Sequence, residues 1–221
     1  MKIVVIAATG GIGRQIVEQA AVTMHEVVAV ARRPTGFPAD VRTVAVDLSA
    51  CDERVLGDAI RGADAVLSGL GPRRTAEIGV AERGTAAIVQ AMRVAQVRRL
   101  LVVSAAPIGT VASPGRPRPP RHDPGDGFFM RHLLAPIVKT VLREHYRDLA
   151  CMEDVLRDSG LDWTAVRPPQ LDDRPCSGEY RFALDRNVPG GLKIGRADVA
   201  HLMLAAISQR DTVGHTIGVA Y

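Results

Sequence analysis

The first residues with recognisable chemistry form the stretch AATGGIGR, which follows an apolar run at the N-terminus. In a dinucleotide-binding loop, small residues permit a tight turn, let the backbone approach a pyrophosphate and let the next helix pack against the sheet. A helix that starts there also presents free N–H groups to an anion. The order strand, loop and helix favours this interpretation over a merely structural turn. The expected contacts are Ala7, Thr9, Gly10, Gly11, Ile12 and Gly13.

One position of this motif departs from the usual pattern. Ala7 stands where a glycine is common. An alanine is tolerated there if its φ angle is negative, because a positive φ is unfavourable for residues other than glycine. We therefore expect a negative φ at Ala7.

Two arginines end the second apolar run, EVVAVARR. Enzymes that bind NAD usually carry a carboxylate there, which accepts hydrogen bonds from the ribose hydroxyls. A guanidinium cannot accept them, but it can bind a 2′-phosphate and stack on adenine. The alternative is that Arg32 and Arg33 are solvated side chains at a strand end. The arginines predict NADP(H) as the cofactor.

Further cofactor contacts are expected where the third and fourth apolar runs end. Asp47, followed by Leu48, can accept a hydrogen bond from the adenine amino group, or it can cap the helix that follows. The segment from Ser68 to Gly71 offers a backbone surface of small residues beside the ribose. The predicted contacts in that segment are Gly69, Leu70 and Gly71.

The apolar runs themselves predict the scaffold that brings these residues together. Runs rich in β-branched residues alternate with helix-length segments, as in βαβ units. We therefore expect an α/β Rossmann-type fold with a doubly wound, mostly parallel sheet. The runs begin at Lys2, Glu26, Arg42, Asp64, Arg99 and Trp163. Helices are expected at 12–22, 52–61, 80–95, 128–159 (divided at Pro136) and 196–207, and short strands in EYRFAL, GLKI and HTIGVAY.

Length and composition favour one domain over residues 1–221. The segment 113–127 is rich in proline and glycine, which predicts a surface loop, and a flexible loop is favoured over an active-site lid. The segment 172–178 is expected to be irregular.

Several classes of function fit the composition poorly. The net charge is +4, but the arginines are dispersed and aromatic content is only 4%, so nucleic-acid binding is not expected. No apolar run approaches the roughly 20 residues of a membrane span, and no signal peptide precedes the first run, which predicts a cytoplasmic protein. Cys51, Cys151 and Cys176 lack the spacing of a zinc site or a disulfide framework, and no metal is expected.

Four stretches resemble one family over nearly the whole chain: AATGGIG, VVSAA, MEDVLRDSGLDWTAVRPPQL and GLKIGRADVAHLML. They are similar to the atypical short-chain dehydrogenase/reductase group, NAD(P)H-binding and NmrA-like, and within it to the biliverdin-IXβ reductase (flavin reductase) branch. The resemblance implies a nicotinamide-dependent reductase of flavins or related conjugated acceptors. It also places the serine that ends the fifth run beside the nicotinamide.

In this chain that serine is Ser104. A hydroxyl at the carboxyl end of a central strand can bond a substrate carbonyl or the nicotinamide carboxamide, or it can simply cap the strand. The resemblance also implies that RPPQL walls the nicotinamide pocket through Pro168, Pro169 and Gln170. The flavin-reductase branch carries a histidine where this chain has Gln170, so a titratable group is missing and a shared substrate is in doubt.

The tyrosine–lysine pair of typical short-chain dehydrogenases is absent. The residue four positions after Tyr146 is Ala150, and the position four before Glu153, often a lysine in related atypical proteins, is Leu149. Alcohol oxidation by an activated tyrosinate is therefore not expected. His145 and Tyr146 remain as candidate proton donors or as plain helix surface, and Lys139 is a weaker candidate.

These residues together predict an NADPH-dependent reductase that transfers a hydride to a small conjugated acceptor such as a flavin, a biliverdin or a quinone. We expect a monomer or a small homo-oligomer. One alternative is a non-catalytic NADP(H) sensor of the NmrA-like type. A nucleotide-sugar epimerase or dehydratase is disfavoured by the missing pair and the short C-terminal region. The fold alone cannot separate them.

Overall fold

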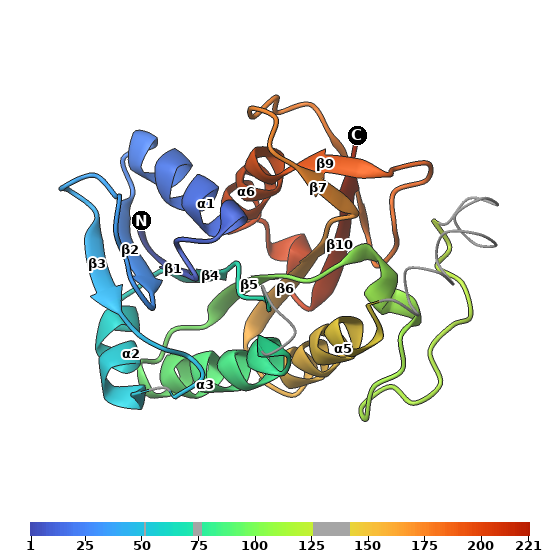
Figure 1. Ribbon diagram of the computed structural model, residues 1–221, viewed down its shortest axis with the longest axis horizontal. Helices are drawn as coiled ribbons and strands as arrows, with labels where there is room; N and C mark the ends of the chain where they lie inside the picture. The colour runs from blue at the N-terminus through green and yellow to red at the C-terminus, as the bar shows by residue number, and fades with distance from the viewer. Residues whose placement is uncertain (51, 73–76, 126–141) are drawn as a thin grey trace.

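One eight-stranded sheet organises the chain in a computed structural model that describes residues 1–50, 52–72, 77–125 and 142–221 (Figure 1). Its order is β3-β2-β1-β4-β5-β6-β10-β8, and every neighbouring pair is parallel except β10 with β8. The strands are β1 (Lys2–Ile6), β2 (Glu26–Ala31), β3 (Arg42–Ala45), β4 (Ala65–Ser68), β5 (Arg99–Val103), β6 (Asp162–Arg167), β8 (Arg181–Leu184) and β10 (His215–Ala220). The predicted Rossmann-type, mostly parallel fold is confirmed.

Helices cover both faces of the sheet. In Figure 1, α1 and α6 lie on one side, and α2, α3 and α5 lie on the other. Because both faces are covered, the central strands are mostly apolar, and Ile3 to Ile6 are fully buried. The helices are α1 (Gly11–Val22), α2 (Glu53–Ile60), α3 (Val80–Val94), α5 (Arg143–Arg157) and α6 (Arg196–Ala205), with 3-10 turns η2 (Ala106–Thr110) and η4 (Arg210–Thr212).

The register of the central strands places the predicted site residues at one edge. Ile6 is level with Val30 in β2 and with Ser68 in β4. The residues that follow these three positions therefore leave the sheet side by side. Ligands of doubly wound sheets bind at this carboxyl edge, where the strand order reverses.

The C-terminal third adds features that the sequence pattern did not indicate. β7 (Gln170–Asp172) pairs with β9 (Lys193–Gly195) in a separate two-stranded sheet. Of the segment 172–178, only Asp172 belongs to this strand, and residues 173–178 form no helix or strand, as expected. The expected helix 128–159 is represented by α5, whereas Pro136 and residues 126–141 lie outside the described residues. Within the described ranges, no helix has both the length and the apolar character needed to cross a bilayer.

The described part of the predicted loop, 113–125, is attached to the body of the protein. The Gly115 N–H donates to Asp154 at 2.9 Å. Asp123 is 4% exposed and accepts from the N–H groups of Gly125 and Asn187. These contacts join the described part of the loop to α5 and to Asn187, and its flexibility stays a prediction.

Candidate cofactor site and active site

The predicted phosphate loop joins β1 to α1. Gly10 is the N-cap of α1, and its N–H donates to the Ala7 carbonyl at 2.8 Å. The first N–H groups of a helix have no partner within it, so they remain available to an anion. The expectation of a negative φ at Ala7 is wrong, because the angle is +55°. This left-handed conformation, which costs roughly 1 to 2 kcal/mol for an alanine, accompanies the turn of the Ala7 carbonyl toward Gly10.

Close backbone packing explains two of the predicted glycines. A Cβ atom on Gly13 would lie 2.4 Å from the Ala7 carbonyl oxygen, so only glycine lets α1 approach the loop. A Cβ on Gly69 would lie 3.3 Å from the Gly13 nitrogen, which shows that the end of β4 rests against the same loop. At Gly71, by contrast, no atom of the described residues lies within 4 Å of a Cβ position. This narrow cradle of backbone with open space beside it fits the pyrophosphate and ribose of a dinucleotide.

Gly11 has a different neighbour, which the sequence did not indicate. A Cβ there would lie 2.6 Å from Cδ and 2.8 Å from Nε of Arg196, the first residue of α6. The arginine therefore crosses the start of α1. Thr9 is partly exposed, whereas Ile12 is buried in the core between the sheet, α1 and α6.

The adenosine end is formed by residues after β2 and β3. Arg32 and Arg33 are both exposed, and Arg32 Nη1 lies 2.9 Å from Glu77 Oε1. Asp47 accepts from the N–H and hydroxyl of Ser49, and the hydroxyl bond is the main cause of the lowered pKa of Asp47. The alternative that Asp47 caps the next helix is wrong, because Asp52 caps α2.

Two predicted leucine contacts serve mainly in packing. Leu48 is 9% exposed and belongs to the core between the sheet and α2, α3 and α5, and Leu70 packs against that core. The Leu70 N–H also donates to the Ser68 hydroxyl at 3.3 Å, which fixes the turn after β4.

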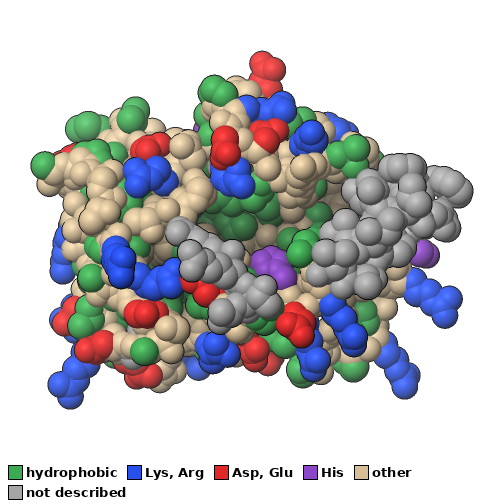
Figure 2. Space-filling view, in the orientation of Figure 1, with side chains coloured by type: hydrophobic (Ala, Val, Ile, Leu, Met, Phe, Trp, Pro, Cys, Tyr) green, Lys and Arg blue, Asp and Glu red, His purple; other side chains and the backbone are tan. Residues whose placement is uncertain are grey.

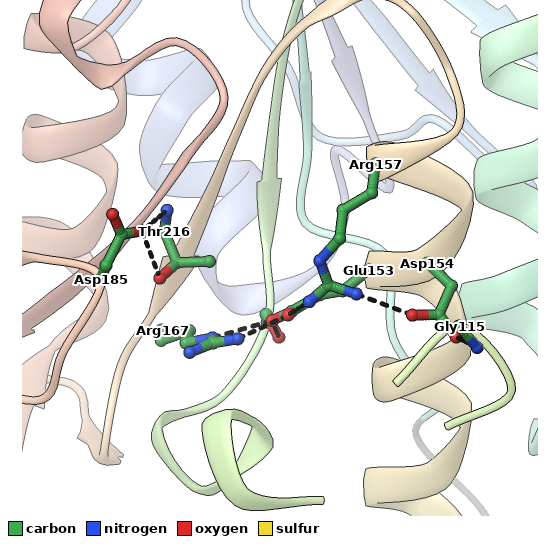
Figure 3. Close-up of polar contacts among 8 residues, drawn as sticks. Gly115, Glu153, Asp154, Arg157, Arg167, Asp185 and Thr216 are labelled. Atoms are coloured by element: carbon green, nitrogen blue, oxygen red, sulfur yellow. Dashed lines mark hydrogen bonds and ion pairs between the residues drawn. The ribbon is translucent and has the colours of Figure 1, made fainter. Parts of the chain in front are cut away.

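Ser104 directly follows β5 and is buried beside Glu153, whose contacts with Arg157 and Arg167 are drawn in Figure 3. Its Oγ donates to Glu153 Oε1 at 2.8 Å. Glu153 is 1% exposed and also accepts from Nε and Nη2 of Arg167, at 2.8 and 2.5 Å, and from Arg157 at 2.9 Å. A carboxylate only accepts hydrogen bonds, so the one O–H of Ser104 is used inside the protein. Toward a ligand, Ser104 can therefore act only as an acceptor.

The loop after β6 lies next to Ser104. The Ser104 N–H donates to the Val166 carbonyl at 2.7 Å, and the Ala106 N–H donates to the Pro168 carbonyl at 3.0 Å. Pro168 is buried, Pro169 is partly exposed and Gln170 is exposed at the start of β7. The structure thus brings together the two segments that were expected to wall the nicotinamide pocket. Figure 2 shows a hollow near the middle of this view, with hydrophobic side chains at its floor.

The candidate proton donors lie at the start of α5. Tyr146 is 8% exposed, so its interpretation as helix surface is wrong, and burial raises the pKa of its phenol. His145 is half-buried, and burial lowers the pKa of its imidazole despite the nearby Asp148 carboxylate. At neutral pH the phenol is protonated and the imidazole is uncharged. Lys139 lies outside the described residues.

Asp148 is a structural residue that sequence reasoning missed. From α5 it accepts hydrogen bonds from the N–H groups of Gly79, Ala81 and Glu82, at 2.9 to 3.2 Å, and so caps the start of α3. Gly79 supplies the positive φ of +90° at that turn. No local sequence signal links Asp148 to residues that lie more than 60 positions earlier.

A sequence model of the family described as NAD(P)H-binding matches residues 7–210 of this chain. The chain belongs to the NAD(P)H-binding family. A protein of the UPF0659 group from Schizosaccharomyces pombe is 31% identical over 109 residues, which cover 49% of this chain and 41% of that protein. The alignment therefore spans about two fifths of the length of that relative.

Two solved structures share the fold of this family member. A candidate NADH-flavin reductase of Streptococcus pneumoniae is 23% identical, with a TM-score of 0.75 over 100% of this chain and 99% of that chain. A wide-type short-chain dehydrogenase/reductase of Veillonella parvula, solved in complex with NADP, is 17% identical, with a TM-score of 0.76 over 100% and 94%. The resemblance to the biliverdin-IXβ reductase branch stays a prediction.

Membership of the NAD(P)H-binding family agrees with the geometry of the cradle. The α1 start, Gly13 and the β4 end would hold the pyrophosphate and ribose, and Ser104 would lie at the nicotinamide end. Among the described residues, no group of three or more histidine, cysteine or acidic side chains could hold a metal ion.

Proposed function

We propose that this protein is an NADPH-dependent reductase that transfers a hydride to a small conjugated acceptor such as a flavin, a biliverdin or a quinone. The observation that carries the proposal is the state of the groups at the nicotinamide end. Ser104 is fixed by Glu153, and burial keeps Tyr146 protonated and His145 uncharged. Among the described residues, these groups provide no activated acid or base, which fits a site that orients its reactants.

NADPH would supply the hydride, and a conjugated acceptor can take its proton from solvent. The chain's own residues then have three tasks. Backbone N–H groups at the start of α1 bind the pyrophosphate. Ser104 accepts a hydrogen bond from the carboxamide and so orients the nicotinamide ring. The segments after β5 and β6 enclose the reacting atoms, which limits access of water.

The direct test measures NADPH oxidation by purified protein with a panel of flavins, quinones, biliverdins and imines. Turnover with at least one conjugated acceptor is expected. Tight NADPH binding without turnover of any compound would contradict the reductase proposal and favour the sensor of the NmrA-like type. The same assay with NADH compares the two cofactors.

Turnover with such an acceptor is expected to be nearly constant between about pH 7 and 9. Burial moves the pKa of His145 below its ordinary value of about 6.5 and that of Tyr146 above its ordinary value of about 10, so neither group changes charge in this window. The measurement is kcat against pH at saturating NADPH. A sigmoidal change within the window that disappears in Tyr146→Phe would assign a proton-transfer step to this tyrosine.

Ser104→Ala is expected to lower kcat about threefold to tenfold, because one neutral hydrogen bond that orients the ring is lost. NADPH affinity should change little, since most contacts lie elsewhere along the dinucleotide. Ser159→Ala is the matched control, because Ser159 is also buried but its hydroxyl bonds only to nearby backbone: it donates to the Leu156 carbonyl and accepts from the Leu161 N–H. Equal rates in both variants and wild type would reassign Ser104 to a structural role.

A further inference from the structure

The Arg196 side chain lies against the start of α1, directly after the phosphate loop. Its side chain passes over Gly11 so closely that a Cβ atom on that glycine would lie 2.6 Å from its Cδ. Beyond this crossing, Nη1 forms an ion pair with Asp173 Oδ1 at 2.6 Å. The guanidinium thus lies between the anion-binding start of α1 and an acidic residue of the strand-to-loop segment after β7.

The two ends of this ion pair are held very differently. The start of α6 is fixed to α1, because the Gln19 amide donates to the Ala197 carbonyl at 2.9 Å and Ala197 is buried. The Asp173 side chain, by contrast, is 87% exposed, and that of Arg196 is 30% exposed. An ion pair with so exposed a partner contributes little to stability and is easily exchanged for another anion.

The other arginine beside the loop is engaged elsewhere. Arg14, in the first turns of α1, donates to the Gly36 carbonyl at 3.1 Å and stacks on the Phe37 ring at 5.3 Å. It therefore points away from the phosphate cradle toward the loop after β2. Arg196 is the arginine whose stem touches the helix start itself.

We propose that Arg196 binds the pyrophosphate of the dinucleotide and that Asp173 competes for it. Binding would exchange the Arg196–Asp173 pair for a pair between Arg196 and a phosphate oxygen. Because a bidentate guanidinium–phosphate contact is stronger than an exposed ion pair, the exchange favours the bound state. Gly11 is a glycine so that Arg196 can reach this position. The inference rests on dinucleotide binding and is independent of which acceptor, if any, is reduced.

The test is a set of equilibrium titrations with NADP⁺, NAD⁺ and adenosine 2′-monophosphate. Arg196→Gln should weaken NADP⁺ and NAD⁺ binding by the same factor, about tenfold to a hundredfold. Adenosine 2′-monophosphate, which has no pyrophosphate, should bind as it does to wild type. Asp173→Asn should tighten both dinucleotides about twofold to fivefold, since the competitor is removed.

A double-mutant cycle separates competition from general charge effects. In the Arg196→Gln background, Asp173→Asn should change nothing. Asp172→Asn is the matched control. It removes the same charge one residue earlier, but Asp172 pairs with Arg174, at 2.8 Å, and not with Arg196. The proposal is overturned if Asp172→Asn tightens binding as much as Asp173→Asn, or if the Asp173 effect persists without Arg196. It is also overturned if Arg196→Gln keeps wild-type affinity for NADP⁺.

These titrations need no turnover, so they remain decisive if the reductase proposal fails. Arg196→Lys provides a second variant that keeps a charge at the helix start. It should retain part of the affinity that Arg196→Gln loses, because an ammonium can bind phosphate but not with two parallel hydrogen bonds. Affinity as low as that of the glutamine variant would contradict an electrostatic role.

Discussion

Replacing Glu153 with glutamine is expected to lower the free energy of unfolding by about 3 to 5 kcal/mol. The carboxylate is 1% exposed and contacts two guanidiniums, of which Arg167 is itself 5% exposed (Figure 3). Removing its charge takes away the carboxylate that contacts the buried Arg167, and this accounts for most of the loss. Urea-induced unfolding measures it, and the m-value should stay unchanged.

Asp58→Asn is the control for an ion pair of the same length at the surface. Asp58 lies 2.9 Å from Arg61, and the two side chains are 62% and 74% exposed. Its loss should cost no more than about 0.5 kcal/mol. If Glu153→Gln lowered the free energy of unfolding no more than this control, the buried network would contribute no more to stability than a surface ion pair. Ser104 would then lose its assigned anchor as well.

Replacing Arg32 with alanine is expected to abolish a preference for NADP(H). No carboxylate ends β2, so the adenosine ribose hydroxyls of NAD(H) find no acceptor there, whereas a 2′-phosphate can pair with the Arg32 guanidinium. The Arg32 side chain is 56% exposed, and it forms one ion pair, with Glu77 at 2.9 Å. The contact between Arg32 and the 2′-phosphate should be stronger than this ion pair, because it is bidentate and charge-assisted.

Arg32→Ala should lower the affinity for NADP⁺ about tenfold to a hundredfold, whereas its affinity for NAD⁺ should stay within about twofold of wild type. Titration of both dinucleotides into wild type, Arg32→Ala and Arg33→Ala measures it. Arg33 is the matched control, because it is the adjacent exposed arginine and precedes Pro34. Equal affinities of wild type for NADP⁺ and NAD⁺, or a preference that survives Arg32→Ala, would show that this arginine does not read the phosphate.

The order of elements was predictable because each strand carries its own signal. KIVVI and EVVAVA are continuous apolar runs, as doubly covered strands require, and they became β1 and β2. Even β3, an edge strand with a mostly exposed RTVA sequence, was located by its β-branched residues. By contrast, QLD is too short and too polar to signal a strand, and it is one only because residues Lys193–Gly195 lie beside it.

The site was predicted less completely, because its decisive contacts join distant positions. The roles of Gly10 and Gly13 follow from a local motif, whereas Arg196 meets Gly11 only after α6 packs on α1. Likewise, a serine after β5 suggested a hydroxyl that bonds the ligand, but its O–H donates to Glu153, which is 49 residues away. The predicted sign of φ at Ala7 was wrong because the carbonyl of that residue accepts a hydrogen bond from Gly10 in the turn that follows.

The position of two acids on α5 has a consequence for how this family can vary. Asp148 caps the start of α3, and Glu153, five residues later, holds Ser104. Five residues turn a helix by about 500°, so the two carboxylates leave it in directions about 140° apart. Inserting or deleting one residue between them would rotate one acid by about 100° away from its partner. We therefore expect the length of this interval to be invariant among relatives that keep both acids.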